Sequence, residues 1–181
     1  MLPAVTQTLA EILAGGTSLI STEQIDFNHP GLQQGMEPLL NLYCYDIREH
    51  NEGQYSVWQI GRRNSYETQD TTSEKYSTVW IDVSFLVSVW GFTALGEQRL
   101  LSEALKLLLR HRKLPEEVLD PTLRGHGNLQ LLVCAIKPLD ALALWSALGV
   151  RLRPALYVTV TIPLQLKAES IHPSRLISSK D

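Results

Sequence analysis

Apolar positions along this chain recur with two different spacings, and these spacings predict its strands and helices. Alternation with a period of two, together with β-branched and aromatic residues, predicts strands at 39–48, 80–90, 129–136 and 154–164. Spacings of three and four positions predict amphipathic helices at 2–14, 97–113 and 138–148. A weaker strand is expected at 21–27. The order of these elements is irregular and does not predict a repeating βαβ array.

Glycine and proline mark the ends of several elements. Pro3 and Pro138 suit the first turns of their helices, because a proline there loses no helical hydrogen bond. Gly15 and Gly16 are expected to end the first helix, and Gly149 suits the position just after the third.

The predicted strand at 80–90 has two unlike faces. One face is apolar throughout and consists of Ile81, Val83, Phe85, Val87 and Val89. The other face mixes polar and apolar residues: Asp82, Ser84, Leu86, Ser88 and Trp90. This pattern predicts one buried face and one partly wet face. The helix at 97–113 follows closely and carries a broad leucine-rich face for packing on the sheet.

These elements predict an α+β fold with a mixed, largely antiparallel sheet and helices packed on one face. We expect a single domain over residues 1–164. The polar stretch at about 49–78 is long for a loop, and segment 54–60 within it could pair with segment 76–81 at its end as a projecting hairpin. Residues 165–181 are expected to form a polar C-terminal tail.

Charge and composition exclude several classes of protein. The formal net charge is −3, so bulk charge gives no reason to expect nucleic-acid binding. No run approaches the ~18 apolar residues of a membrane helix, and the N-terminus lacks the features of a signal peptide. Cys44 and Cys134 are expected to be buried free thiols, with a disulfide as the less favoured alternative. We expect a protein that is soluble and cytoplasmic when made and is not inserted in a membrane.

No motif in the sequence predicts catalysis, a cofactor or a metal site. The five histidines lack metal-ligand spacing, and there is no nucleophile elbow. The segment 125–127 has glycines around His126 but lacks the lysine and hydroxyl of a phosphate-binding loop, so we expect a simple turn. Asp46 with Glu49, or Asp82 across the sheet, could form a carboxylate pair, but solvated strand-end acids are commoner. We therefore do not expect an enzyme.

Two groups of residues are candidates for a protein interface. Arg110, His111, Arg112 and Lys113 form a basic cluster at a helix end. Cations at the C-terminal end of a helix stabilise it by interacting with the helix dipole, which could explain the cluster. The alternative is that the cluster forms a patch for an acidic partner. The polar stretch contains a second group, Tyr55, Trp58, Arg62 and Arg63. Aromatic and arginine residues are enriched in interfaces, but Tyr55 and Trp58 could equally pack a hairpin onto the domain.

Several blocks of the sequence follow the order of a known family. They are LLNLYCYDIREH, a polar stretch with Arg62 and Arg63, then IDVSFLVSVWG, EQRLLSEALKLLLRHRKLP and LWSALGVRLRPALYVTV. From about residue 1 to residue 164 the chain resembles the tail-terminator or cap protein family of phage-tail-like contractile injection systems, a family of domains of unknown function. The basic RHRK departs from the more neutral helix end that is common there.

The resemblance implies a structural function without catalytic residues. Proteins of this kind form a ring, usually sixfold, that closes the tail end distal to the baseplate. The ring ends the inner tube and holds the last layer of sheath protein. The implied partners are further copies of the chain, the sheath protein and the inner tube protein. The alternative is a tail-completion or adaptor protein of the same kind of particle that does not form a ring.

Overall fold

The computed structural model describes residues 1–17, 21–32, 38–50, 76–133 and 138–167. Its three α-helices are α1 (Leu2–Gly16), α2 (Ala94–Arg110) and α3 (Pro138–Ala147). Its six strands are β1 (Ile25–Asp26), β2 (Leu39–Glu49), β3 (Tyr76–Trp90), β4 (Lys113–Leu114), β5 (Leu129–Val133) and β6 (Ala155–Lys167). Short 3-10 helices include η2 (Pro30–Leu32), η4 (Glu116–Val118) and η5 (Pro121–Leu123).

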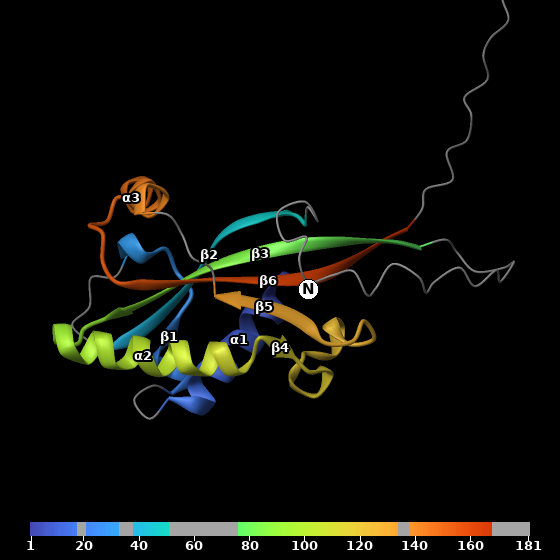
Figure 1. Cartoon of the computed structure of the whole chain (residues 1–181), viewed down its shortest axis with the longest axis horizontal. Helices are drawn as coiled ribbons and strands as arrows, with labels where there is room; N and C mark the ends of the chain where they lie inside the picture. The colour runs from blue at the N-terminus through green and yellow to red at the C-terminus, as the bar shows by residue number, and fades with distance from the viewer. Residues whose placement is uncertain (18–20, 33–37, 51–75, 134–137, 168–181) are drawn as a thin grey trace, which may run out of the picture.

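The strands form one sheet in the order β1-β2-β3-β6-β5-β4. Only β1 is parallel to its neighbour, and every other pairing is antiparallel. The longest pairing joins β3 to β6 and runs from Ser88 with Ala155 to Tyr76 with Lys167. Its far end, 76–80 paired with 163–167, projects beyond the helices (Figure 1). We call this projection the β-arm.

The main core lies between the sheet and the two longer helices. Both α1 and α2 cover the same face of the sheet (Figure 1), where they bury the apolar face of β3 predicted from the sequence. The fully buried side chains there include Leu9, Leu13, Leu100, Leu108 and Phe85. Burial of each contributes on the order of 2 kcal/mol.

The other face of the sheet carries a second, smaller core beneath α3. Trp145 of α3 is fully buried against Leu86 of β3 and Tyr157 of β6, and its indole N–H donates to the Tyr157 hydroxyl at 3.0 Å. The predicted α+β fold with a mostly antiparallel sheet is therefore confirmed, but α3 lies opposite α1 and α2 (Figure 1). The second face of β3, expected to be partly wet, is buried from Asp82 to Ser88.

The helix ends differ from expectation at two places. Gly15 and Gly16 lie inside α1, and α1 passes into extended backbone at Thr17. A side chain at Gly16 would place its Cβ 2.3 Å from Leu107 Cδ2, so this glycine permits α1 and α2 to approach closely. Helix α2 begins at Ala94, where the Thr93 hydroxyl accepts from the Gly96 N–H, and ends at Arg110.

The outermost strands on both sides of the sheet are short in the described part of the chain. Strands β1 and β4 each contain two residues, and β1 covers only Leu40 and Asn41 of its neighbour. A β-bulge between Cys44 and Asp46 interrupts the register of β2 with β3 further along. Short edge strands and bulges both reduce the chance that another strand adds to a sheet.

Several smaller predictions have mixed outcomes. The weak strand expected at 21–27 is reduced to Ile25–Asp26, and residues 51–75, with most of the expected hairpin, lie outside the described residues. Cys44 is a free, partly buried thiol, whereas Cys134 also lies outside the described part. No helix within the described ranges is long and apolar enough to cross a membrane.

Candidate interaction surfaces

The basic cluster lies where α2 passes into β4. His111 caps the helix, with its backbone N–H donating to the Leu107 carbonyl at 3.1 Å. The backbone carbonyl of Arg112 accepts a hydrogen bond from the Leu131 N–H. Lys113 of β4 lies opposite Gln130 of β5 in the sheet. The side chains of Arg110, Arg112 and Lys113 are exposed and form no ion pair within the described residues. They form a free positive patch whose backbone is fixed on one side by the sheet.

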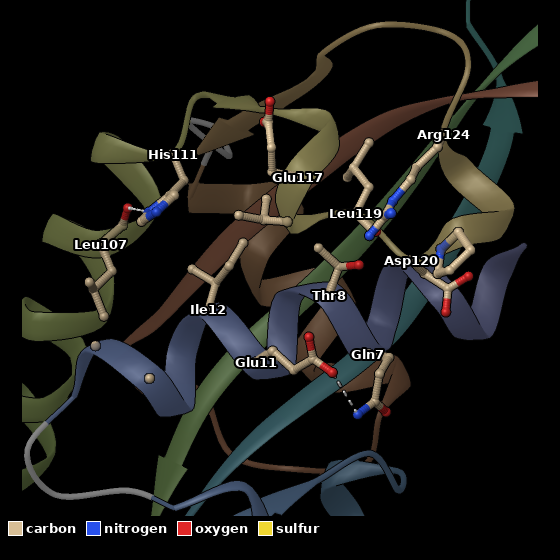
Figure 2. A pocket seen from close by; sticks show the side chains of 14 residues that line it. Gln7, Thr8, Glu11, Ile12, Leu107, His111, Glu117, Leu119, Asp120 and Arg124 are labelled. Carbon is tan, nitrogen blue, oxygen red and sulfur yellow. Dashed lines mark hydrogen bonds between the residues drawn. The ribbon is translucent and has the colours of Figure 1, made fainter.

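A groove of about 650 Å³ opens beside this cluster, between α1, the end of α2 and the segment 117–124 (Figure 2). His111 and Arg124 contribute positive or titratable groups to its lining, and Glu11, Glu117 and Asp120 contribute acids. Hydrogen bonds from the Thr122 side chain and backbone lower the pKa of Asp120. The groove therefore has mixed charge and no catalytic constellation.

The loop beside the groove is held by an acid. Glu116 Oε1 accepts hydrogen bonds from the backbone N–H groups of Gly125 at 3.1 Å and Gly127 at 2.6 Å. The turn expected around His126 is therefore held by a carboxylate of the same chain.

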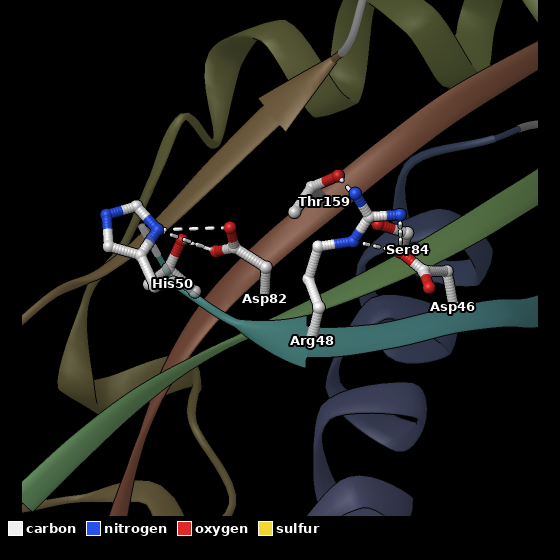
Figure 3. A network of polar contacts seen from close by, with 7 residues as sticks. Asp46, Arg48, His50, Asp82, Ser84 and Thr159 are labelled. Carbon is white, nitrogen blue, oxygen red and sulfur yellow. Dashed lines mark hydrogen bonds and ion pairs between the residues drawn. The ribbon is translucent and has the colours of Figure 1, made fainter. Parts of the chain in front are cut away.

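A polar network crosses the sheet on the face that carries α3 (Figure 3). His50 Nδ1 lies 3.0 Å from each carboxylate oxygen of Asp82, which also accepts from the Thr161 hydroxyl at 2.7 Å. The acids considered as a catalytic pair have separate partners, because Asp46 pairs with Arg48 while Asp82 pairs with His50. The groove is lined by none of Asp46, Asp82 or His126.

Four large apolar side chains of the described residues are more than half exposed. They are Leu95 (77%), Leu32 (66%), Leu152 (56%) and Leu142 (54%). The other exposed large apolar side chains in the described residues are all less than half exposed.

Contacts between distant segments fix the backbone near the start of α2 and the end of α3. Arg153, next to Leu152, pairs with Glu97 near the start of α2 and stacks 3.9 Å above the centroid of the Trp90 ring. A Cβ at Gly31 of η2 would lie 3.3 Å from the Leu148 carbonyl oxygen that follows α3. Sequence reasoning missed these contacts because they join segments that are far apart in the chain.

The comparison with protein families decides the identity of the domain. The model of the Pvc16 N-terminal domain matches residues 4–179. The chain belongs to this family. No curated protein sequence matches it.

Solved structures share the fold of this Pvc16 N-terminal domain. One is the sheath/tube terminator of an extracellular contractile injection system, PVC, in the extended state, with a TM-score of 0.65 at 21% identity. Another is the tube-terminating cap of the anti-feeding prophage, AFP, with a TM-score of 0.53 at 15% identity. The alignments cover 100% and 99% of this chain but 63% and 59% of those proteins. This Pvc16 N-terminal domain thus spans about three fifths of each structure's length.

The candidate interface residues of this Pvc16 domain fall into two sets. Arg110, Arg112 and Lys113 are brought together at the α2–β4 junction. The other set, Tyr55, Trp58, Arg62 and Arg63, lies outside the described residues. Among the residues that are described, no group of three or more His, Cys, Asp or Glu side chains is placed to hold a metal ion.

Proposed function

We propose that this chain is a tube terminator, or cap, of a contractile injection system. The observation that carries the proposal is the match of the Pvc16 N-terminal domain to residues 4–179, which is nearly the whole chain. The likeness to a sheath/tube terminator and to a tube-terminating cap supports it at the level of the fold. In this function the chain acts as a structural subunit and not as an enzyme.

The cap is a homohexameric ring that ends the inner tube and binds the last layer of sheath. A closed ring needs two different surfaces on each subunit, because each copy meets its neighbours head to tail. A terminator also needs a surface that fits the tube and sheath below it. The basic cluster of Arg110, Arg112 and Lys113 supplies a free charged patch for an acidic surface on the sheath protein.

The segment with Tyr55, Trp58, Arg62 and Arg63 is a second contact region of the cap. Its support is compositional, since aromatic and arginine side chains dominate the energetics of many interfaces. The cap is made in the cytoplasm and becomes a soluble part of a phage-tail-like particle, outside any membrane.

Electron microscopy of particles with this chain labelled tests the proposal. The label should appear at one end only, distal to the baseplate, and native mass spectrometry should show the chain as a hexamer. Deletion of the gene should give overlong or unstable tubes. A chain that stays monomeric and never co-purifies with particles would refute the proposal.

A different phenotype would favour the adaptor alternative. Tubes of normal length that lack cargo or have lost their baseplate would indicate a tail-completion protein that does not form a ring.

A further inference from the structure

The groove between α1, the end of α2 and the segment 117–124 is lined by apolar side chains from three elements (Figure 2). They are Ile12 of α1, Leu107 of α2 and Val118 of η4, and none of the three is buried. Apolar side chains that meet in a hollow and stay accessible to water are typical of a site that another segment covers.

Acids accompany these apolar side chains in the groove. Glu11, Glu117 and Asp120 line it, and none of them belongs to an ion pair within the described residues. The hydrogen bonds from Thr122 that lower the pKa of Asp120 keep its carboxylate charged at neutral pH. Arg124 is the one arginine of the lining, so the acids outnumber it. The groove therefore suits a segment that carries apolar residues together with cations.

The described part of the chain ends close to this groove. The side-chain nitrogen Nε2 of Gln165 in β6 lies 3.4 Å from Nε2 of His126. Arg124, two positions before His126, lines the groove. The last described residue, Lys167, is two positions beyond Gln165. Residues 168–181 therefore leave β6 beside one wall of the groove.

The sequence that follows β6 has the complementary pattern. Leu176 and Ile177 are adjacent apolar residues, with Arg175 directly before them and Lys180 three positions after them. The run 175–180 contains no acid. Because the family model matches the chain as far as residue 179, nearly all of this run belongs to the domain.

The length of the chain allows this run to reach the groove. Residues 168–175, at about 3.3 Å for each extended residue, span up to roughly 26 Å between Lys167 and Leu176. Because the run is tethered to β6, it meets the groove at an effective concentration on the order of 1 mM. A fit of a few side chains is therefore enough to keep the groove covered for much of the time.

We propose that residues 175–180 occupy the groove of the same chain. Leu176 and Ile177 pack on its apolar lining, and Arg175 and Lys180 lie near its acids. This contact joins the end of β6 to α1 and η4. It does not depend on the proposed function.

Disulfide trapping in the whole chain tests the contact directly. In a background of Cys44→Ser and Cys134→Ser, Val118→Cys with Ile177→Cys should form a disulfide within one chain under mild oxidation. Leu95→Cys with Ile177→Cys is the matched control, because Leu95 is an exposed leucine at the other end of α2. The Val118 pair should cross-link at least about tenfold faster than the control, and its rate should not change on dilution. Mass spectrometry of the intact chain identifies the product.

Charge reversal in the run tests the contribution of the acids. Arg175→Glu with Lys180→Glu should slow the cross-linking by about tenfold at low salt, and the effect should shrink as salt screens the charges. Arg175→Lys with Lys180→Arg keeps both charges and should leave the rate unchanged. Equal rates in the two variants would show that the acids do not hold the run.

A chain that stops at Lys167 gives an independent measurement by NMR. Without the run, the amide resonances of residues 11–16 and 117–120 should shift, whereas those of residues 95–100 should not. A synthetic peptide of residues 168–181, added to the shortened chain, should move the shifted resonances back toward their positions in the whole chain. A peptide of the same composition in scrambled order should have no such effect.

The outcomes separate this contact from other uses of the groove. Trapping no faster than in the control, or resonances that do not change on shortening, would overturn the proposal. Cross-links that form only between chains, at rates that grow with concentration, would place the run in the groove of another copy and overturn docking within one chain. If the shortened chain fails to fold, trapping in the whole chain decides. Imaging of labelled particles decides separately whether the chain is a cap.

Discussion

Two acidic residues of the sheet look alike in the sequence but differ in how much they stabilise the fold. Asp46 and Asp82 are both acids on strands, two candidates for one carboxylate pair. Asp82 is 8% exposed and bonded to both His50 and Thr161, whereas Asp46 has Arg48, a largely exposed side chain, as its ion-pair partner. Burial and partners distinguish the two acids, and neither can be read from alternation along a strand.

This difference predicts unequal losses of stability. Asp82→Ala should lower the free energy of unfolding by about 2–4 kcal/mol, because it removes the buried carboxylate that binds both His50 and Thr161. Asp46→Ala, the matched control, should cost less than about 1 kcal/mol because its pair is partly exposed. Urea unfolding of both variants measures the difference. Equal losses would show that the network around Asp82 is not structurally important.

The thiol of Cys44 should react slowly at neutral pH. Burial raises its pKa, with a smaller contribution in the same direction from the charge of Asp46. A raised pKa leaves less thiolate, and the thiolate is the reactive form. In a Cys134→Ser variant, alkylation by iodoacetamide at pH 7.5 should be at least about tenfold slower than for a free cysteine peptide.

The alkylation rate of Cys44 should rise as the pH approaches the raised pKa of its thiol. In urea, the unfolded protein should react as fast as the cysteine peptide. A folded protein that reacts as fast as the peptide would contradict the effect of burial.

At the scale of elements, the sequence predicted the strands and helices with strong periodic patterns. The segments expected at 39–48 and 80–90 are within β2 and β3, and the helix expected at 97–113 overlaps α2. Periodicity shows which positions are buried, but it does not show which other helix or strand covers them. Helix α3 is apolar almost all round, so its sequence could not show which face of the sheet it would cover.

Contacts between elements were the second limit on prediction. Strand β4 has two residues and exists because Lys113 and Leu114 pair with β5, which a local pattern does not reveal. The contacts of Arg153 with Glu97 and Trp90 likewise join separate segments. The basic cluster was found from the sequence because its charges are consecutive.

The two glycines of α1 should respond in opposite directions to alanine. Gly15→Ala should raise the free energy of unfolding by about 0.5 kcal/mol, because no atom lies within 4 Å of its new Cβ and alanine favours the helix. Gly16→Ala should lower it by about 1 kcal/mol, since the Leu107 side chain must move. Thermal unfolding compares the two variants. A gain of stability at Gly16 would show that α1 and α2 can separate without cost.

At the scale of the whole molecule, the candidate contact surfaces lie in separate places. The basic cluster and the β-arm occupy different parts of the chain, and both are carried by a sheet with helices on both faces. A subunit with separate surfaces can bind a neighbour and a further protein at once. The proposed cap requires this combination.

Charge reversal of the basic cluster should weaken binding to particles and leave the fold intact. Arg110→Glu with Arg112→Glu should reduce association with sheath-bearing particles by about tenfold at low salt, and the effect should shrink as salt screens the charges. Arg99→Glu with Lys106→Glu is the matched control, because it makes the same change of net charge at exposed positions of α2. Co-sedimentation at several salt concentrations measures both. Equal losses in the two variants would indicate an effect of net charge alone.

The short outer strand β1 has a consequence for how a further strand could add to the sheet. Because β1 pairs only with Leu40 and Asn41, the outer side of β2 from Leu42 to Glu49 has no strand neighbour among the described residues. The bulge between Cys44 and Asp46 is then the feature of β2 that hinders a further strand from adding there. A polymer grown by strand addition would have to begin past that bulge.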